Sequence, residues 1–404
     1  MTAVEIFRQL RSAFAPKTLI CGVLIGFGAL CLLGRQAARE NLHKHFIRFT
    51  QWTGPETKYY PTVNEMMAIV RAKIKPGQIL VVVGGNSVLR GVGQPPERVW
   101  TKYLQENLGD GYCVVNFAFN GSGVTDGGAV AAEALRREFP RQIYMANAAP
   151  TQGSVPDGSV VYRFMFWDAY HKGLLVDDPA RNAAIHESHK LPYYAEGMNE
   201  LHAREWLDHW FYFQDFWNDI TLVKFNTVWG FYVPGLTKFL QPRKRLPDPE
   251  PDFLAMPMSS RYVEANLEAE MLNVRGCSVY AYNKDAEGKW QPYTPVWDQF
   301  FAATKGLFPP ELKQRTLILM SRNSPYYIRR LAPDEQERND LAYLDAVKNW
   351  QKIGYASMDY GSDFTIDDYG DRTHLTWHGG VKLAKLVSVK VGAMSQELGY
   401  LDKR

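Results

Sequence analysis

The sequence "ILVVVGGNSVLRGVG", residues 79–93, joins a short apolar run to a turn that is rich in glycine. Five consecutive apolar residues, mostly β-branched and bounded by glycine, are typical of a parallel strand that is buried on both faces. Gly84, Gly85, Asn86 and Ser87 should therefore lie at the carboxyl end of this strand. In open parallel sheets, functional groups gather at that end. Ser87 is therefore the first candidate functional residue.

Similar apolar runs recur along the chain and alternate with segments of helical periodicity. Further strands are expected at residues 112–119, 143–146, 316–320 and 355–358. Helices are expected at residues 62–75, 127–139 and 334–353, and a last helix follows residues 368–380. Strands that alternate with helices predict an α/β fold with a doubly wound, mostly parallel sheet.

Composition limits the class of protein. The 404 residues, 46% of them hydrophobic and 22% charged, suffice for one large domain or two ordinary ones with a substantial core. A net charge of +3 without a long basic run gives no electrostatic footprint for nucleic acid, which we exclude as a partner. The four cysteines lack metal-binding spacing, so no metal is expected. Cys113 and Cys277 allow either one disulfide or two buried thiols.

The N-terminal region contains "TLICGVLIGFGALCLLG", residues 18–34, which carries no charge and follows Arg8, Arg11 and Lys17. As a helix this stretch is about 26 Å long, at the short end of what crosses a bilayer. We favour an uncleaved membrane anchor, and a cleaved signal peptide is the alternative. Basic residues flank both ends, so the positive-inside rule does not orient the segment.

The expected organisation follows from these segments. It comprises a cytoplasmic N-terminus (1–17), a transmembrane anchor (18–34), a polar helical stalk with an amphipathic helix (35–75), a first part of the α/β domain (76–155), an insertion (156–311) and a second part of the α/β domain (312–404).

The insertion is rich in aromatic residues and is expected to be mainly helical. Large apolar side chains recur there at helical spacing, at Trp206, Trp210, Phe213, Trp217 and Ile220. Core packing is the favoured interpretation. The alternatives are an interfacial helix that lies on the bilayer and an aromatic wall for sugar rings. Charged residues within the stretch argue against a full membrane span.

Taken alone, the glycine-rich turn has several interpretations. Neither GxGxxG nor a GKS or GKT ending is present, which argues against a nucleotide, and no cofactor is expected. A GxSxG elbow fails because Leu89 occupies the final glycine position. Ser87 could also serve as an ordinary helix N-cap, for which serine is a preferred residue.

Other polar residues are expected at the same edge of the sheet. Asn116 lies in the second expected strand, Asn120 and Gly121 follow it, and Asn147 follows the third. Near the C-terminus, Asp371 precedes His374 by three residues. A serine nucleophile needs a base, the imidazole needs a carboxylate to fix its tautomer, and an oxyanion needs convergent N–H donors. The chain supplies each of these groups.

Their order and local sequence resemble the SGNH, or GDSL-type, hydrolase superfamily. The resemblance covers about half the chain, residues 76–155 and 312–395, through "GGNSVLRG", "NFAFNG", "MANAA" and "DRTHLT". It implies Ser87 as the nucleophile, His374 as the base and Asp371 as its partner. It also implies an oxyanion hole formed by Ser87, Gly121 and Asn147.

Two positions depart from the family pattern. Asn86 replaces the usual aspartate before the serine, and Ala146-Asn147-Ala148 stands where the family has Gly-Asn-Asp. Both departures keep the catalytic groups, but they could reshape the pocket or mark a decayed site.

Residues near the motifs are candidates for substrate binding, namely Asn86, Asn120, Trp377 and His378. The spacing of His374 and His378 does not indicate a metal site, because no HExxH accompanies it. Asp363, Asp367 and Asp368 are expected in a solvated loop.

An anchored SGNH-like domain with a large insertion resembles membrane-linked esterases and O-acetyltransferases that modify bacterial envelope polysaccharides. The resemblance implies a serine-dependent acyl esterase or O-acyltransferase that acts on an envelope or extracellular glycan, with a separate membrane acyltransferase as the candidate donor. It also implies a single-pass protein of the bacterial inner membrane with a periplasmic globular part. The alternative is a non-catalytic structural or assembly subunit.

Overall fold

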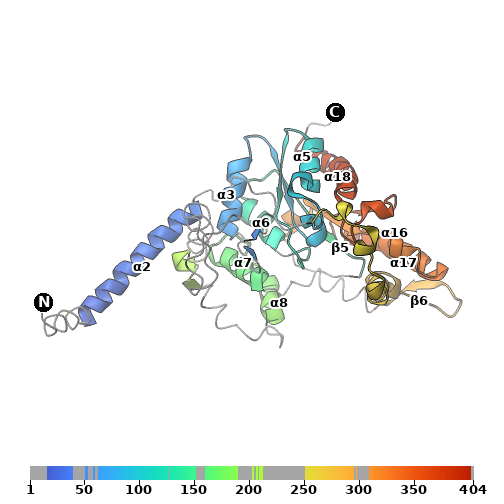
Figure 1. Ribbon diagram of the computed structural model, residues 1–404. Helices are drawn as coiled ribbons and strands as arrows, with labels where there is room; N and C mark the ends of the chain where they lie inside the picture. The colour runs from blue at the N-terminus through green and yellow to red at the C-terminus, as the bar shows by residue number, and fades with distance from the viewer. Residues whose placement is uncertain are drawn as a thin grey trace.

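The computed structural model describes residues 16–39, 51–52, 58–59, 62–125, 127–151, 160–189, 203, 206–207, 209–212, 251–294, 297 and 309–401. Figure 1 shows an α/β body from which one long helix, α2, projects.

The body is built on a parallel sheet of five strands in the order β4-β3-β5-β8-β9. The strands are β3 (Ile79–Val83), β4 (Tyr112–Asn116), β5 (Gln142–Ala148), β8 (Thr316–Ser321) and β9 (Ala356–Tyr360). Each expected strand is present, and the predicted α/β class with a parallel sheet is confirmed. The second strand is shorter than expected, because residues 117–119 continue as a loop.

One face of the sheet packs against the C-terminal helix. Ile79, Val81 and Val83 alternate along β3 and join a buried cluster with α5 (Trp100–Leu108) and α18 (Trp377–Glu397). Because side chains alternate across a strand, this face takes every second residue of β3.

The opposite face is also covered by helices. Leu80 and Val82 join a second buried cluster with α3 (Val63–Lys73), α6 (Gly127–Leu135) and α17 (Pro333–Lys352). A sheet that is covered on both faces explains why its central strand is apolar throughout.

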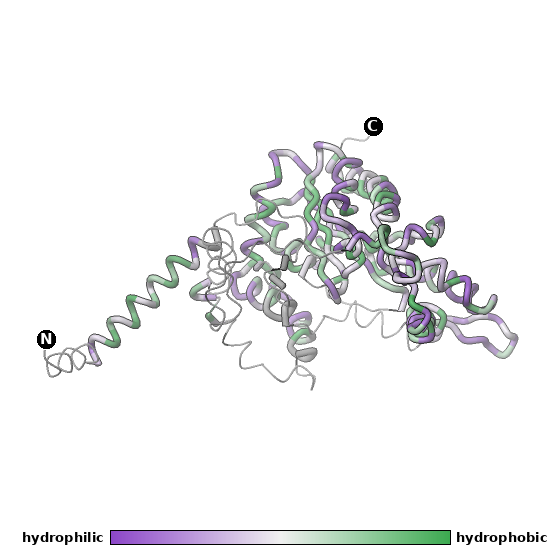
Figure 2. Tube along the Cα trace, in the orientation of Figure 1, coloured by the Kyte–Doolittle hydropathy of each residue, from purple (hydrophilic) through white to green (hydrophobic). Residues whose placement is uncertain are grey.

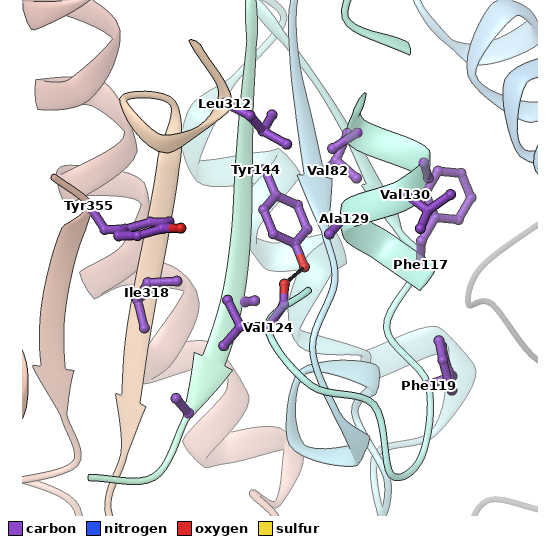
Figure 3. Close-up of a cluster of buried hydrophobic side chains, with 14 of the residues drawn as sticks. Val82, Phe117, Phe119, Val124, Ala129, Val130, Tyr144, Leu312, Ile318 and Tyr355 are labelled. Atoms are coloured by element: carbon purple, nitrogen blue, oxygen red, sulfur yellow. Dashed lines mark hydrogen bonds between the residues drawn. The ribbon is translucent and has the colours of Figure 1, made fainter. Parts of the chain in front are cut away.

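Tyr144 of β5 lies in the middle of the second cluster. Figure 3 shows its ring beside Ala129 of α6, and its hydroxyl donates a hydrogen bond of 2.6 Å to the carbonyl of Val124. The buried hydroxyl thus has an acceptor, and the bond ties the loop after β4 to β5.

The direction of strand order reverses next to β3. The chain passes from β3 through α5 to β4 on one side, and then through α6 to β5 on the other side of β3. In open α/β sheets, ligands bind at the carboxyl ends of the strands where the order reverses. The turn after β3 and the end of β5 lie at this position.

A long insertion connects β5 to β8. Its described elements are α7 (Val160–His171), α8 (Pro179–His189), η4 (Phe253–Ala255), α12 (Met258–Arg261), η5 (Glu264–Asn266), α13 (Leu267–Cys277), η6 (Val279–Ala281) and a hairpin of β6 (Tyr282–Lys284) and β7 (Trp290–Pro292). Met165, Phe166 and Trp167 of α7 are buried in the same cluster as α6. The start of the insertion is therefore part of the body.

Short elements complete the described chain. They are β1 (Gln51–Trp52), β2 (Lys58–Tyr59), α4 (Ser87–Arg90), η1 (Pro96–Arg98), α15 (Pro310–Lys313), α16 (Pro325–Ile328) and η7 (Ile366–Asp368). Strands β1 and β2 pair antiparallel. The polar helical stalk expected within residues 35–75 is therefore wrong at Gln51–Trp52, and residues 40–50 lie outside the described part of the chain.

Helix α2 (Pro16–Arg39) contains the expected apolar segment. Residues Pro16–Gln36 are long and apolar enough to cross a membrane by length and composition. Most of its large apolar side chains are exposed, and Figure 2 shows the helix as mainly hydrophobic. The apolar helix therefore begins two residues earlier than the expected anchor.

The structure also tests the expectations for the aromatic residues of the insertion, for the two cysteines outside α2 and for Asp368. Trp206 and Trp210 are 53% and 54% exposed, so core packing is wrong for both. Phe213, Trp217 and Ile220 lie outside the described residues. Cys113 and Cys277 are free thiols. Asp368 is buried rather than solvated.

Candidate active site

The turn after β3 requires glycine at two positions. A Cβ on Gly84 would lie 2.5 Å from the hydroxyl of Tyr144. Gly85 has φ +83°, and a Cβ there would lie 2.5 Å from Oδ1 of Asn147. Only glycine adopts this backbone conformation without strain and allows the close approach of the β5 side chain. The turn is thereby fixed against the end of β5.

The turn leads into the short helix α4, which begins at Ser87. Oδ1 of Asn86 accepts a hydrogen bond of 3.0 Å from the N–H of Val88, so Asn86 is the N-cap of this helix. The N-cap interpretation of Ser87 is therefore wrong. Because Ser87 occupies the first helical position, its own N–H has no partner within the helix.

Ser87, His374 and Asp371 form a continuous chain of hydrogen bonds. Nε2 of His374 lies 2.7 Å from Oγ of Ser87, and Nδ1 of His374 lies 2.6 Å from Oδ2 of Asp371. With its proton on Nδ1, the imidazole donates to the carboxylate and accepts from the serine hydroxyl. This arrangement can remove a proton from Ser87.

The electrostatic environment keeps Asp371 ionised. Burial raises the pKa of this carboxyl. The hydrogen bond and charge of the His374 side chain lower the pKa, as do the hydrogen bonds from the N–H groups of His374 and Thr373. These effects outweigh burial, so the pKa lies below its usual value. The Asp371 carboxylate is therefore available to orient the imidazole and to stabilise its protonated form.

A tight turn places Asp371 and His374 beside the serine. Tyr369 and Leu375 pair as an antiparallel bridge, and the N–H of Gly370 donates to the carbonyl of His374 over 2.8 Å. Thr376 then caps α18, with its hydroxyl donating to the carbonyl of Asp367. The turn is therefore held on both sides before the helix begins.

Gln94 links this turn to the loop after α4. Its Nε2 donates to the carbonyl of Leu375 over 3.1 Å, and its Oε1 accepts from the N–H of Trp100 over 2.9 Å. Gln94 is fully buried. The His374 turn is thus tied to the segment that carries Ser87, although 287 residues separate the two catalytic candidates in sequence.

The segment after β4 lies alongside the Ser87 turn. The N–H groups of Phe117 and Phe119 donate to the carbonyls of Val83 and Gly85 over 2.7 and 3.1 Å. Gly121 follows with φ +76° and is exposed. Among the described residues, neither its N–H nor that of Ser87 has a hydrogen-bond partner. Both N–H groups could therefore bind an oxyanion.

Asn147 is buried and has a full set of partners. Its Oδ1 accepts from the N–H of Asn86 over 3.0 Å, which fixes the orientation of the amide. Its Nδ2 donates to Oδ1 of Asn86 over 2.8 Å and to Oγ of Ser321 over 3.2 Å. In this arrangement both amide hydrogens bind protein acceptors. An oxyanion role for Asn147, which stays a prediction, requires one of them to be released.

The remaining binding candidates surround the site less closely. Asn120 and His378 are exposed, and the ring centroids of Trp377 and His378 lie 3.9 Å apart. The guanidinium of Arg98 lies 4.7 Å from the centroid of Trp377. Asn86 precedes Ser87 in the turn and is hydrogen-bonded to Asn147. The described contacts do not link Asn120, Trp377 or His378 to this turn. A binding role for the others stays a prediction.

Residues of the insertion that the sequence did not single out hold the His374 turn. The ring of Phe253 lies against Gly93 and Gly370, where a Cβ would collide with it, and its centroid is 6.5 Å from that of His374. The N–H of Phe253 donates to the carbonyl of Gly93 over 3.0 Å. Two small residues opposite one aromatic ring are the only sequence signal, and it could be interpreted only once the loops had been placed together.

Two charged residues of the insertion also bind this turn. Nη1 of Arg261 donates to the carbonyl of Tyr369 over 3.0 Å. Oε2 of Glu270 accepts from Nε of Arg372 over 2.6 Å, and Arg372 also donates to Oδ1 of Asn323 over 3.0 Å. The second half of the insertion therefore fixes the loop that carries the candidate base.

In the part of the chain that the structure describes, no group of three His, Cys, Asp or Glu side chains could hold a metal ion. Comparisons with protein-family models, with curated proteins and with solved structures find no match to this chain.

Proposed function

We propose that this protein is a membrane-anchored, serine-dependent acyl esterase or O-acyltransferase of the SGNH type. The observation that carries the proposal is the hydrogen-bonded chain from Asp371 through His374 to Ser87, with heavy-atom distances of 2.6 and 2.7 Å. These are the distances that a nucleophile, its base and the orienting carboxylate require. Their position where the strand order reverses next to β3 supports the same conclusion.

The first chemical step transfers the acyl group to the enzyme. His374 takes the proton from Oγ of Ser87 as this oxygen attacks the carbonyl carbon of an ester. The tetrahedral intermediate collapses when the carbon–oxygen bond to the leaving alcohol breaks, and the alcohol oxygen takes the proton from Nε2 of His374. The products are the free alcohol and an acyl-serine.

The second step releases the acyl group. His374 removes a proton from water or from an acceptor hydroxyl, whose oxygen attacks the acyl-serine carbonyl. Collapse of this intermediate returns the electron pair to Oγ of Ser87, which takes the proton from His374. Water gives hydrolysis, and a sugar hydroxyl gives transfer. The N–H groups of Ser87 and Gly121 stabilise the oxyanion in both steps, and Asn147 adds a third donor when its amide is released.

The overall architecture agrees with this class. Helices cover both faces of the sheet, as an SGNH-like doubly wound fold requires. We propose that α2 anchors the protein in the bacterial inner membrane, with the N-terminus in the cytoplasm and the body in the periplasm. A body held at the membrane surface suits an acylated envelope glycan as substrate, and a separate membrane acyltransferase as the source of the acyl group.

Covalent labelling tests the catalytic assignment. A fluorophosphonate should label the full-length protein at Ser87, and both Ser87→Ala and His374→Ala should abolish labelling. Ser388→Ala, which removes the hydroxyl of a partly exposed residue on α18, is the matched control and should label like the wild type. A folded wild type that takes up no label would contradict the proposal and favour the structural or assembly subunit.

A further inference from the structure

The C-terminal half of α2 packs against a short aromatic segment of the insertion, and the proposed catalysis does not use this contact. The ring centroids of Phe27 and Phe211 lie 4.0 Å apart, and Sγ of Cys31 contacts the carbonyl of Trp210. A Cβ on Gly34 would collide with the backbone of Phe211. Residues 27, 31 and 34 lie on one face of a helix. The aromatic segment, which we define as residues 206–207 and 209–212, therefore packs along one face of α2.

This aromatic segment presents two indole rings to the outside. Trp206 and Trp210 are four residues apart on a helical stretch and are 53% and 54% exposed. The ring of Trp206 also packs against that of Phe211, at a centroid distance of 5.6 Å. Exposed apolar side chains of α2, including Leu32 and Leu33, lie on the adjoining helix. The exposed surfaces of the segment and of α2 are therefore both apolar.

A cationic group marks one end of this surface. The guanidinium of the exposed Arg35 lies 5.9 Å from the ring centroid of Tyr212. Nζ of Lys172 lies 4.8 Å from the same ring, but this ammonium is buried and paired with Asp168, so it holds Tyr212 against α7 and does not face the headgroups. A tyrosine beside an exposed arginine, next to exposed indoles, is the side-chain pattern of a membrane interface, where aromatic rings and basic groups meet the lipid headgroups.

The geometry of α2 gives the depth of the contact. Arg35 lies near the end of the apolar stretch Pro16–Gln36, whereas Phe27 is eight residues earlier. At 1.5 Å per residue the two are separated by about 12 Å along the helix axis. If Arg35 lies at the headgroups, the aromatic segment reaches from the headgroups into the outer part of the acyl chains, close to the depth of known interfacial helices.

We propose that the aromatic segment is a second membrane contact, in which Trp206 and Trp210 insert into one leaflet beside α2. The proposal rests on the anchoring part of the proposed function, but not on catalysis by Ser87. The favoured occupant of this surface is lipid, because the segment continues the surface of a helix with the length and composition of a membrane span. Two contacts restrict the tilt of the body and hold the site at a defined height above the bilayer.

Tryptophan quenching in lipid vesicles tests this proposal on the full-length protein. The protein is reconstituted in phosphatidylcholine vesicles with bromine on the acyl chain near the headgroup, and acrylamide serves as the aqueous quencher. Helix α2 contains no tryptophan, so it adds no emission of its own. The variant Trp206→Phe/Trp210→Phe should lose emission that bromolipid quenches and acrylamide does not.

The matched control is Trp290→Phe, on the β6–β7 hairpin, whose indole donates to Glu337. The emission that this control removes should be insensitive to bromolipid. If the emission from Trp206 and Trp210 is quenched by acrylamide, the segment faces water and the proposal is wrong. If neither quencher reaches it, protein covers the segment, which also overturns the proposal. If the protein does not enter the vesicles at all, the proposal that α2 is a membrane anchor is wrong. Fluorophosphonate labelling of Ser87 tests catalysis and does not depend on either membrane contact.

Discussion

Asn147 and Asn86 bind each other through two hydrogen bonds, one from the N–H of Asn86 to Oδ1 of Asn147 and one from Nδ2 of Asn147 to Oδ1 of Asn86. The pair joins the end of β5 to the residue that precedes Ser87. Asn86 stands where the resemblance leads one to expect aspartate. Its amide supplies the acceptor that also caps α4, so this departure keeps the turn intact.

Substitutions of Asn147 and Ser321 distinguish a catalytic role of the Asn147 amide from a role in stabilising the Ser87 turn. Asn147→Ala should lower kcat on an acetyl ester on the order of 100- to 1000-fold if the amide donates to the oxyanion. It should also destabilise the fold by about 1–3 kcal/mol, because the N–H of Asn86 loses its acceptor. Ser321→Ala frees one amide hydrogen of Asn147 and should leave kcat close to that of the wild type. Steady-state kinetics and thermal unfolding measure both effects.

A purely structural role for Asn147 would give a different pattern. The Asn147→Ala variant would then unfold at a lower temperature but keep its kcat once folded. That outcome would reduce the oxyanion hole to the N–H groups of Ser87 and Gly121.

The catalytic chain predicts a specific relation between single and double substitutions. Ser87→Ala and His374→Ala should each abolish turnover of a small acetyl ester. Ser87→Ala should change the thermal transition little, since the serine side chain is small and only partly buried. His374→Ala should also lower stability, because it removes the side-chain partner of the Asp371 carboxylate. The double variant should be no worse than either single one, because the two groups act as a unit. Additive losses would show that His374 does not activate Ser87.

Short motifs at strand ends carried most of what could be predicted about the site. The apolar run before Gly84 and the spacing of Asp371 and His374 each specify a local structure, and the alternation of strands and helices places their loops at one edge of the sheet. The sequence does not determine the N-cap of α4, because Asn86 and Ser87 are both good capping residues. A helix that began one residue later would have Ser87 as its N-cap. The partners of Asn147 depend on Ser321, which lies on a strand 174 residues away.

Phe253 should matter for both stability and turnover. Phe253→Ala removes the ring that separates Gly93 from Gly370 and should loosen the His374 turn. Substitution of a fully buried phenylalanine by alanine typically costs about 3–5 kcal/mol of unfolding free energy. The loss expected for Phe253→Ala is smaller, because this side chain is half-buried. We expect kcat to fall more than KM rises, because the altered group positions the base. Leu272→Ala, at an exposed position on α13, is the control and should change neither quantity.

A Phe253→Ala variant with unchanged kcat would show that Gln94 and Arg261 suffice to hold the turn. Sequence patterns could not have found this role for the insertion. The segment around Phe253 follows a proline-rich, charged stretch, and its partners lie about 160 and 117 residues away on either side. The expectation that Asp368 lies in a solvated loop fails for a similar reason. Its carboxylate accepts from the N–H and hydroxyl of Thr365 and from Lys382, and such local caps resemble a solvated acidic loop in sequence.

A buried ion pair should couple α8, near the start of the insertion, to α6, which covers one face of the sheet. Oε2 of Glu133 on α6 lies 2.6 Å from Nη1 of Arg181 on α8, and both side chains are at most 5% exposed. Glu133→Ala leaves the arginine buried without its carboxylate and should cost about 3–5 kcal/mol of unfolding free energy. The exposed pair of Arg71 and Glu138, at 2.7 Å, is the matched control, and Glu138→Ala should cost no more than about 1 kcal/mol. Equal effects in denaturant titrations would show that burial does not strengthen the α6–α8 pair.

The lowered pKa of Asp371 predicts how stability depends on pH. The carboxyl binds its proton less readily in the folded protein than in the unfolded chain, where its pKa is about 3.9. The unfolded state therefore holds more protons near this pH, and stability rises with pH. The contribution of Asp371 should be complete above about pH 5 and be lost as pH falls through its folded-state pKa below 3.8. The stability difference between the wild type and Asp371→Asn should shrink over this acidic range.

His374→Ala is the companion variant, because it removes the side chain that does most to lower the pKa of Asp371. In that variant the loss of stability from protonation of Asp371 should begin at a higher pH than in the wild type. Unfolding free energies measured from pH 3 to pH 7 distinguish the three proteins. A difference between the wild type and Asp371→Asn that stays constant down to the lowest pH would show that the carboxylate gains no stabilisation from the imidazole. The hydrogen bond between Asp371 and His374 would then not orient the base that activates Ser87.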